Sequence, residues 1–283
     1  MTRTHGKSNG YLITVIVNVV LLGLFFGASR AVHLTPFHLS WKGMLFFMLA
    51  GLLTSGFGRL LLFASIDKIN PSRASALKNV APVFTVLFAL ILLNEHLNLW
   101  EGIGILLLLI AIFLQTVMNF RKSSGRLTTG KFEEKGRAEW IGYLVAVFAA
   151  LIFGVGQGIR KQGLSMLNNA FFGAWVGALT ALCFQIVFLS LQGRLKETIV
   201  QNRKYLNRYF VLAGVFSSTG PLCFFLGASL IPVSFVSVIA AVEPLVTILL
   251  SAMLLKGEED LNLSVWITAI LVLFGTMIIV FSG

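Results

Sequence analysis

Apolar residues are gathered into runs of about 20 residues, separated by shorter polar segments. A helix rises about 1.5 Å per residue, so such a run can cross the roughly 30 Å of hydrocarbon in a bilayer. The pattern predicts nine spanning helices, at 11–28, 43–66, 72–93, 98–119, 139–158, 169–191, 208–230, 234–255 and 262–281. Spanning helices satisfy their backbone hydrogen bonds internally. We therefore expect an all-α, multi-pass membrane protein.

The polar segments between these runs are interpreted as loops. Residues 120–138 are rich in charged and turn-forming residues and are expected to be a solvated linker. Residues 159–168 are expected to form a short loop. The run at 11–28 follows Arg3 and Lys7, as the apolar part of a signal peptide would. It is long for a signal peptide, however, so we interpret it as a spanning helix.

The chain repeats itself at an offset of 162 residues. Matching positions include Ser72 and Ser234, Ser75 and Ser237, Pro82 and Pro244, and Thr85 and Thr247. An internal repeat of this length determines the architecture. It predicts a first repeat at 1–119 with four spans, the linker at 120–138, and a second repeat at 139–283 with five spans. Residue 1 corresponds to Gly163, so the first repeat lacks its first helix, either truly or because the start is misassigned.

Composition agrees with a membrane protein and excludes several other classes. Hydrophobic residues make up 57% of the chain and charged residues 12%. The net charge of +11 is explained by Lys and Arg in cytoplasmic loops and does not require nucleic acid. Cys183 and Cys223 fall in predicted spans, so no disulfide framework or metal site is indicated. The sequence contains no HExxH motif, no P-loop and no GxSxG nucleophile elbow in a strand–turn–helix setting, so we expect neither an enzyme nor a cofactor.

The end of each repeat carries a related motif, NVAPVFTVLFALILLNE at 79–95 and AVEPLVTILLSAMLLKGEE at 241–259. The next helices begin with LNL at 97–99 and at 261–263, and the second repeat opens with LIFGVGQGIRKQGL at 151–164. With these motifs the chain resembles the drug/metabolite transporter superfamily, in its EamA-type branch. The resemblance implies two five-helix repeats of inverted topology, hence a 4+5 arrangement here. It also implies a cell-membrane exporter of amino acids or related metabolites.

Ionisable residues inside predicted spans are the candidates for chemistry, because each costs roughly 2.5–3.5 kcal/mol on insertion scales. Glu243 lies roughly 14 Å into its helix, and Lys78 and Arg59 lie roughly 9 to 10 Å from the opposite face. Transporters built from inverted repeats bind their substrates at this midplane level. We therefore predict a polar substrate or proton site containing Glu243, Lys78, Arg59, Asn79 and Gln157. The alternative is a fixed ion pair of Glu243 with Lys78 or Arg59 that holds the repeats together. For Gln157 and Asn79 the alternative is a hydrogen bond between helices.

Two matched prolines and one carboxylate at a helix end complete the candidates. Pro82 and Pro244 are predicted to break their helices, which frees backbone carbonyls for a ligand or bends the helices around a cavity. Glu95 lies at a helix end, where we expect water to solvate it and assign it a structural role.

The favoured hypothesis is a secondary transporter working by alternating access, with proton exchange through Glu243 as one means of coupling. Its expected partners are a small-molecule substrate, protons and the lipid bilayer. A truncated or non-transporting structural membrane protein, or a subunit of a larger complex, is the alternative. A channel is disfavoured, because no ring of like charges or filter motif is present.

Overall fold

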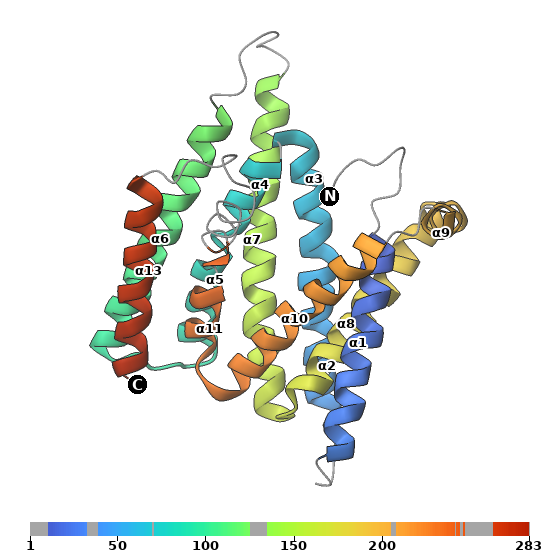
Figure 1. The fold of residues 1–283 in the computed structure, drawn as a ribbon, viewed down its shortest axis with the longest axis horizontal. Coiled ribbons are helices and arrows are strands. Elements are labelled where there is room, and N and C mark those ends of the chain that lie inside the picture. The colour runs from blue at the N-terminus through green and yellow to red at the C-terminus, as the bar shows by residue number, and fades with distance from the viewer. Residues whose placement is uncertain are drawn as a thin grey trace. The chain divides into compact units, whose positions relative to one another are not determined.

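The computed structural model describes residues 11–32, 39–69, 71–124, 135–204, 208–240, 242–243, 246 and 263–282. In these ranges every regular element is a helix (Figure 1). The elements are α1 (Tyr11–Val32), α2 (Trp41–Gly51), η1 (Leu52–Gly58), α3 (Arg59–Ile69), α4 (Pro71–Lys78), α5 (Ala81–Leu92), α6 (Leu99–Ser124), α7 (Lys135–Met166), α8 (Ala170–Leu191), α9 (Leu195–Lys204), α10 (Arg208–Leu230), α11 (Val233–Ala240) and α13 (Leu263–Ser282).

Six helical segments of the described chain are long and apolar enough to cross a membrane. They are Leu12–Val32, Trp41–Ile69, Arg73–Leu92, Glu139–Met166, Ala170–Leu191 and Phe210–Leu230. Shorter apolar helices lie at Leu99–Leu114 and Ile270–Ile279. The all-α membrane class is confirmed. The predicted number of nine spans is not, and most of the predicted span 234–255 lies outside the described residues.

Three helix boundaries differ from the sequence-based expectation. Helix α7 continues to Met166, so the loop predicted at 159–168 is wrong for all but its last residues. Helix α6 extends to Ser124 and α7 begins at Lys135, so helix covers both ends of the predicted linker; residues 125–134 are outside the description. Lys, Arg and Glu have good helix propensity, so each helix can extend beyond its apolar run. The short polar helix α9 was not predicted.

Contacts along the chain define two compact units. Unit 1 comprises residues 1–56 and 159–230, and unit 2 comprises residues 57–158 and 231–283. Each unit therefore combines segments of both predicted repeats. Two continuous helical stretches, 41–69 and α7, contribute residues to both units.

In unit 1, α1 packs against α8 and α10, and α2 packs against α8. Close approach of α2 and α8 depends on two glycines: a Cβ atom on Gly51 would lie 2.5 Å from the carbonyl oxygen of Gly177. The fully buried Phe47 makes edge-on ring contacts with Phe172 and Phe225, with centroids 6.4 and 5.6 Å apart. Small residues and aromatic rings thus hold this unit together, as is common between membrane helices.

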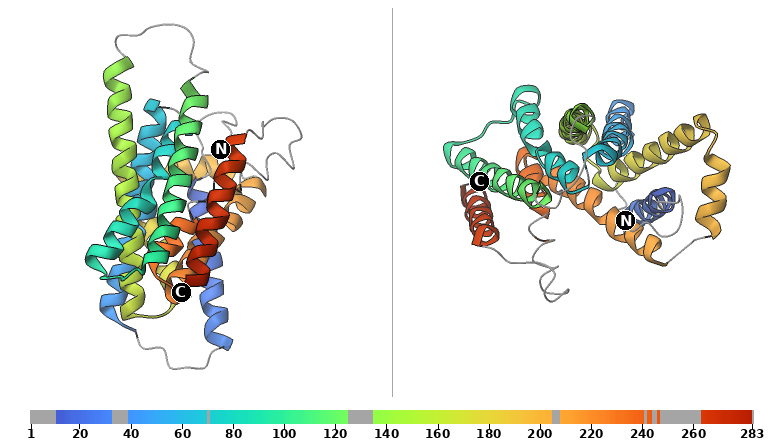
Figure 2. Two further views of the ribbon diagram at one scale, coloured as in Figure 1. Left: turned by 90° about the vertical axis from the view of Figure 1, so that its left-hand side faces the viewer. Right: turned by 90° about the horizontal axis from the view of Figure 1, so that it is seen from above.

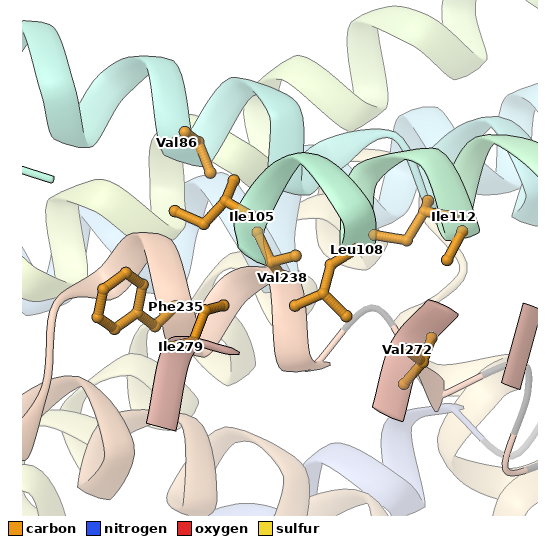
Figure 3. Packing of buried hydrophobic residues seen from close by; sticks show 9 residues of the cluster. Val86, Ile105, Leu108, Ile112, Phe235, Val238, Val272 and Ile279 are labelled. Carbon is orange, nitrogen blue, oxygen red and sulfur yellow. The ribbon is translucent and has the colours of Figure 1, made fainter. Parts of the chain in front are cut away.

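In unit 2, α6 runs beside α13, and α11 packs against α5 and α6 (Figures 1 and 2). A Cβ atom on Gly104 would lie 2.9 Å from the carbonyl oxygen of Gly275, so α6 and α13 meet at a glycine contact. Figure 3 shows apolar side chains of α5, α6, α11 and α13 that point toward one another. This buried cluster consists of Val86, Ile105, Leu108, Ala111, Ile112, Phe235, Val238, Val272 and Ile279.

Candidate functional site

The structure brings the five predicted polar residues into one unit. Arg59, Lys78, Asn79, Gln157 and Glu243 all belong to unit 2. They come from four different helical segments and from the turn after α4.

Lys78, the last residue of α4, stands at the centre of the predicted charges. Its side chain is half-buried, and its Nζ lies 5.4 Å from the centroid of the Phe153 ring on α7. The carboxylate of Glu243 attracts this ammonium group and the guanidinium of Arg59 repels it. Glu243 is exposed and Arg59 is half-buried. Both of the other charges that the sequence singled out, Glu243 and Arg59, therefore act on Lys78 within unit 2.

Gln157 joins two helices through its amide oxygen. Its Oε1 accepts hydrogen bonds from the hydroxyl groups of Thr85 on α5 (3.0 Å) and Ser237 on α11 (2.9 Å). Both hydroxyl side chains are buried. A Cβ atom on Gly154, one turn earlier in α7, would lie 2.6 Å from the carbonyl oxygen of Ala81, so α7 approaches the start of α5 closely.

Thr85 and Ser237 were missed as candidates. The internal repeat contains a signal for both residues, because Thr85 matches Thr247 and Ser237 matches Ser75. Matched polar residues within apolar runs were thus the available signal. Thr247 lies outside the described residues, and Ser75 is exposed on α4.

Asn79 and Pro82 belong to an interruption between two helices. Helix α4 ends at Lys78 and α5 begins at Ala81, with Pro82 buried in the first turn of α5, where a proline nitrogen needs no hydrogen-bond partner. The backbone N–H of Asn79 donates to the carbonyl of Ser75 (3.1 Å). The corresponding Pro244 lies outside the described residues.

Glu95 is half-buried rather than fully solvated, and it caps a helix from the other repeat. Its carboxylate accepts hydrogen bonds from the backbone N–H of Val233 (2.8 Å) and from the N–H (3.3 Å) and hydroxyl (2.7 Å) of Ser234. Both residues begin α11. The preceding Asn94, two residues after the end of α5, has φ of 52°, a left-handed conformation that Asn tolerates, so the chain turns just before Glu95. Sequence reasoning missed this role, because a cap contributed from 138 residues away leaves no local signal.

Unit 1 contains a buried cation in the region predicted to be a loop. Arg160 of α7 is 9% exposed and donates a hydrogen bond from Nη2 to the hydroxyl of Thr54 in η1 (2.8 Å). Its guanidinium carbon lies 5.4 and 5.2 Å from the ring centroids of Phe224 and Phe225 on α10. The next residue, Lys161, donates to the carbonyl of Ala228 (2.7 Å).

Sequence comparison places this helical arrangement in a family. The profile of the EamA-like transporter family matches residues 8–117 and 140–281. The chain belongs to the EamA-like transporter family. The predicted resemblance is thereby confirmed, and this EamA-like protein has the two repeats that the internal similarity indicated. Membership makes it a multi-pass membrane protein of a family that transports small solutes.

Solved structures support the fold. One of them, described only as the crystal structure of a protein, matches 98% of this EamA-like chain and 90% of its own length, with a TM-score of 0.64 and 18% sequence identity. At that identity the similarity concerns the fold alone. A comparison with curated proteins finds no match.

Proposed function

We propose that this protein is a secondary active transporter that exports small organic solutes, with amino acids or related metabolites as the substrate class. The observation that supports the proposal is the charge group of unit 2, in which Glu243 attracts Lys78 and Arg59 repels it. Charged groups in the apolar helices of a transporter family are expected to serve a substrate or an ion, because placing them within the membrane for packing alone is costly.

The proposed site works through competing partners for Lys78. In the resting state the carboxylate of Glu243 offsets the positive charge of Lys78. A substrate carboxylate can take over this role, and Glu243 is then released to accept a proton. Proton movement through Glu243 would in this way be linked to substrate occupancy, which is the requirement for coupled exchange.

The helix interruption next to Lys78 supports the same proposal. Residues 79 and 80 separate α4 from α5, so backbone groups near the end of α4 lack a continuing helix. Broken helices at the level of a charged site are typical of secondary transporters, where the two repeats rock around the substrate. Alternating access of the repeats is the mechanism that we propose here.

An export assay tests the proposal. Cells producing wild type, Glu243→Gln, Lys78→Met or Glu197→Gln at matched levels are compared with empty-vector cells for solutes that accumulate in the medium. Glu197 is an exposed carboxylate on α9, so its variant controls for loss of one negative charge.

We expect wild type and Glu197→Gln to export one class of solute. Glu243→Gln should lose the pH dependence of export, and Lys78→Met should weaken the affinity for zwitterionic solutes. If export by Glu243→Gln keeps the pH dependence of wild type, Glu243 does not couple protons. If all media match the empty vector although the proteins are folded in the membrane, the non-transporting alternative replaces the proposal.

A further inference from the structure

Arg160 is a buried cation for which unit 1 supplies no counter-ion. Unit 1 contains eleven Lys and Arg residues but only one carboxylate residue, Glu197. Unit 2 contains eleven Lys and Arg residues and ten Asp and Glu residues. Glu197 is exposed on α9, where its Oε1 accepts a hydrogen bond from Gln201 (2.9 Å). Among the described residues, no carboxylate pairs with Arg160. Buried charges in proteins are normally paired.

The hydrogen-bonding capacity of Arg160 is also largely unused. A guanidinium group has five N–H donors, and the described residues provide one acceptor, the Thr54 hydroxyl. The Nε atom of Arg160 is buried and has no hydrogen-bond partner. Leaving a charged buried donor unpaired is costly, so the arrangement needs a reason.

Three helices hold the guanidinium in a fixed position. Phe224 and Phe225 of α10 contribute two ring contacts, each of the cation–π type. Thr54 lies in η1, a seven-residue π-helix, and its own hydroxyl donates to the carbonyl of Ala50 (2.8 Å). Short π-helical segments inside α-helices occur frequently at functional sites. The cation is therefore positioned by aromatic and hydroxyl groups, while its Nε donor has no acceptor among the described residues.

The chemistry of these donors indicates the ligand. A planar guanidinium binds a carboxylate through two parallel N–H···O bonds, which would use Nε and neutralise the charge. One positive charge matches a monoanion, whereas a phosphate group carries about −1.5 to −2 charges near neutral pH. The two phenyl rings favour a ligand whose remaining part is apolar or aromatic.

We propose that Arg160, Thr54, Phe224 and Phe225 form a binding site in unit 1 for the carboxylate of a small organic monoanion. This proposal takes from the proposed function only that the solute is small and organic; it does not require that the solute be exported.

Ligand-induced stabilisation of the purified full chain tests the site. Each protein is titrated with 3-phenylpropanoate, 3-phenylpropanamide, benzoate, benzamide and inorganic phosphate, and the shift in thermal unfolding yields the affinity. The acid and amide of each pair differ in charge but hardly in shape. The proteins are wild type, Arg160→Gln, Arg160→Lys and the control Arg194→Gln, which removes an exposed arginine of unit 1.

We expect at least one acid to bind wild type and Arg194→Gln, and its amide to bind neither. Arg160→Gln should weaken acid binding by about 10- to 150-fold, the factor for losing hydrogen bonds to a charged group. Arg160→Lys should lie between them, because an ammonium keeps the charge without the planar fork. If Arg160→Gln does not fold, the loss of acid affinity in Arg160→Lys tests the proposal instead.

Several results would overturn the proposal. Equal acid affinities of wild type and the Arg160 variants would show that Arg160 only packs against the phenyl rings. Acids that fail to bind wild type, amides that bind as well as acids, or phosphate that binds best would each exclude a carboxylate site. Failure of the proposed function is recognised separately: acid binding would then depend on Arg160 while no solute is exported.

Discussion

Replacing Glu95 with alanine removes a helix cap that connects the two repeats. The carboxylate of Glu95 accepts three hydrogen bonds from Val233 and Ser234, so it satisfies two backbone N–H groups in the first turn of α11. It also places a negative charge at the positive end of that helix. In Glu95→Ala both contributions disappear, and the first turn of α11 should open more often.

The size of the effect follows from these contacts. Loss of a side-chain cap costs about 0.5–2 kcal/mol, and hydrogen bonds to a charged group contribute about 1.5–3 kcal/mol each but are not additive. We therefore expect about 2–4 kcal/mol for Glu95→Ala. Glu95→Gln keeps an acceptor and loses the charge, so about 1–2 kcal/mol is expected. With 1.36 kcal/mol per factor of ten, local opening should become about 30- to 900-fold more frequent in Glu95→Ala.

Hydrogen exchange of the backbone amides in α11 measures this opening directly. Glu101→Ala is a matched control, because Glu101 caps its own helix: the N–H of Asn98 donates to its carboxylate (2.7 Å), and its own N–H donates to Asn98 Oδ1 (2.9 Å). This reciprocal pair is a capping box. The control should accelerate exchange at the start of α6 and leave α11 unchanged.

One outcome would refute the reasoning. If Glu95→Ala leaves exchange at Val233 and Ser234 within about twofold of wild type, while Glu101→Ala accelerates exchange in α6, the carboxylate does not hold α11. A comparable acceleration in every helix would mean general destabilisation and would equally contradict a local cap.

Two further predictions concern packing and the amide bridge. Gly51→Ala should destabilise the protein by about 1–3 kcal/mol or more, because its Cβ would lie 2.5 Å from a backbone carbonyl. Thermal unfolding measures this loss. The control Gly27→Ala, where nothing lies within 4 Å, should be neutral or slightly stabilising. Ser237→Ala should cost about 0.5–1.5 kcal/mol, and in a double-mutant cycle with Gln157→Leu the two losses should not add; full additivity would show that the bond to Gln157 contributes nothing.

Much of the fold could be predicted because long apolar runs have one main solution in a bilayer. The run around Pro82 also revealed an interruption, since proline lacks the N–H that a continuous helix needs. The spans gave no information about which helices meet. Hydropathy alone does not predict the two compact units, each of which takes residues from both repeats.

Only some residues of the candidate site could be predicted, because the sequence does not show which helices meet. Lys78, Arg59 and Glu243 stood out as charges within apolar runs, and a cost of burial can be estimated from sequence. Arg160 was missed because its charge suggested the end of a span, whereas α7 continues to Met166 and Thr54 and two phenyl rings contact the guanidinium. The role of Glu95 depends on a partner far along the chain, which no local pattern reveals.

The division of each unit between distant segments also determines when the protein can fold during synthesis. Helix α6 ends at Ser124, and its partner α13 begins at Leu263. At 5–20 residues per second, translation of the roughly 140 intervening residues takes about 7 to 28 seconds. Until then the face of α6 around Gly104 has no partner, and α1 likewise waits for α8 and α10. Early helices must therefore persist in the membrane as separate spans, and assembly of both units depends on the second repeat.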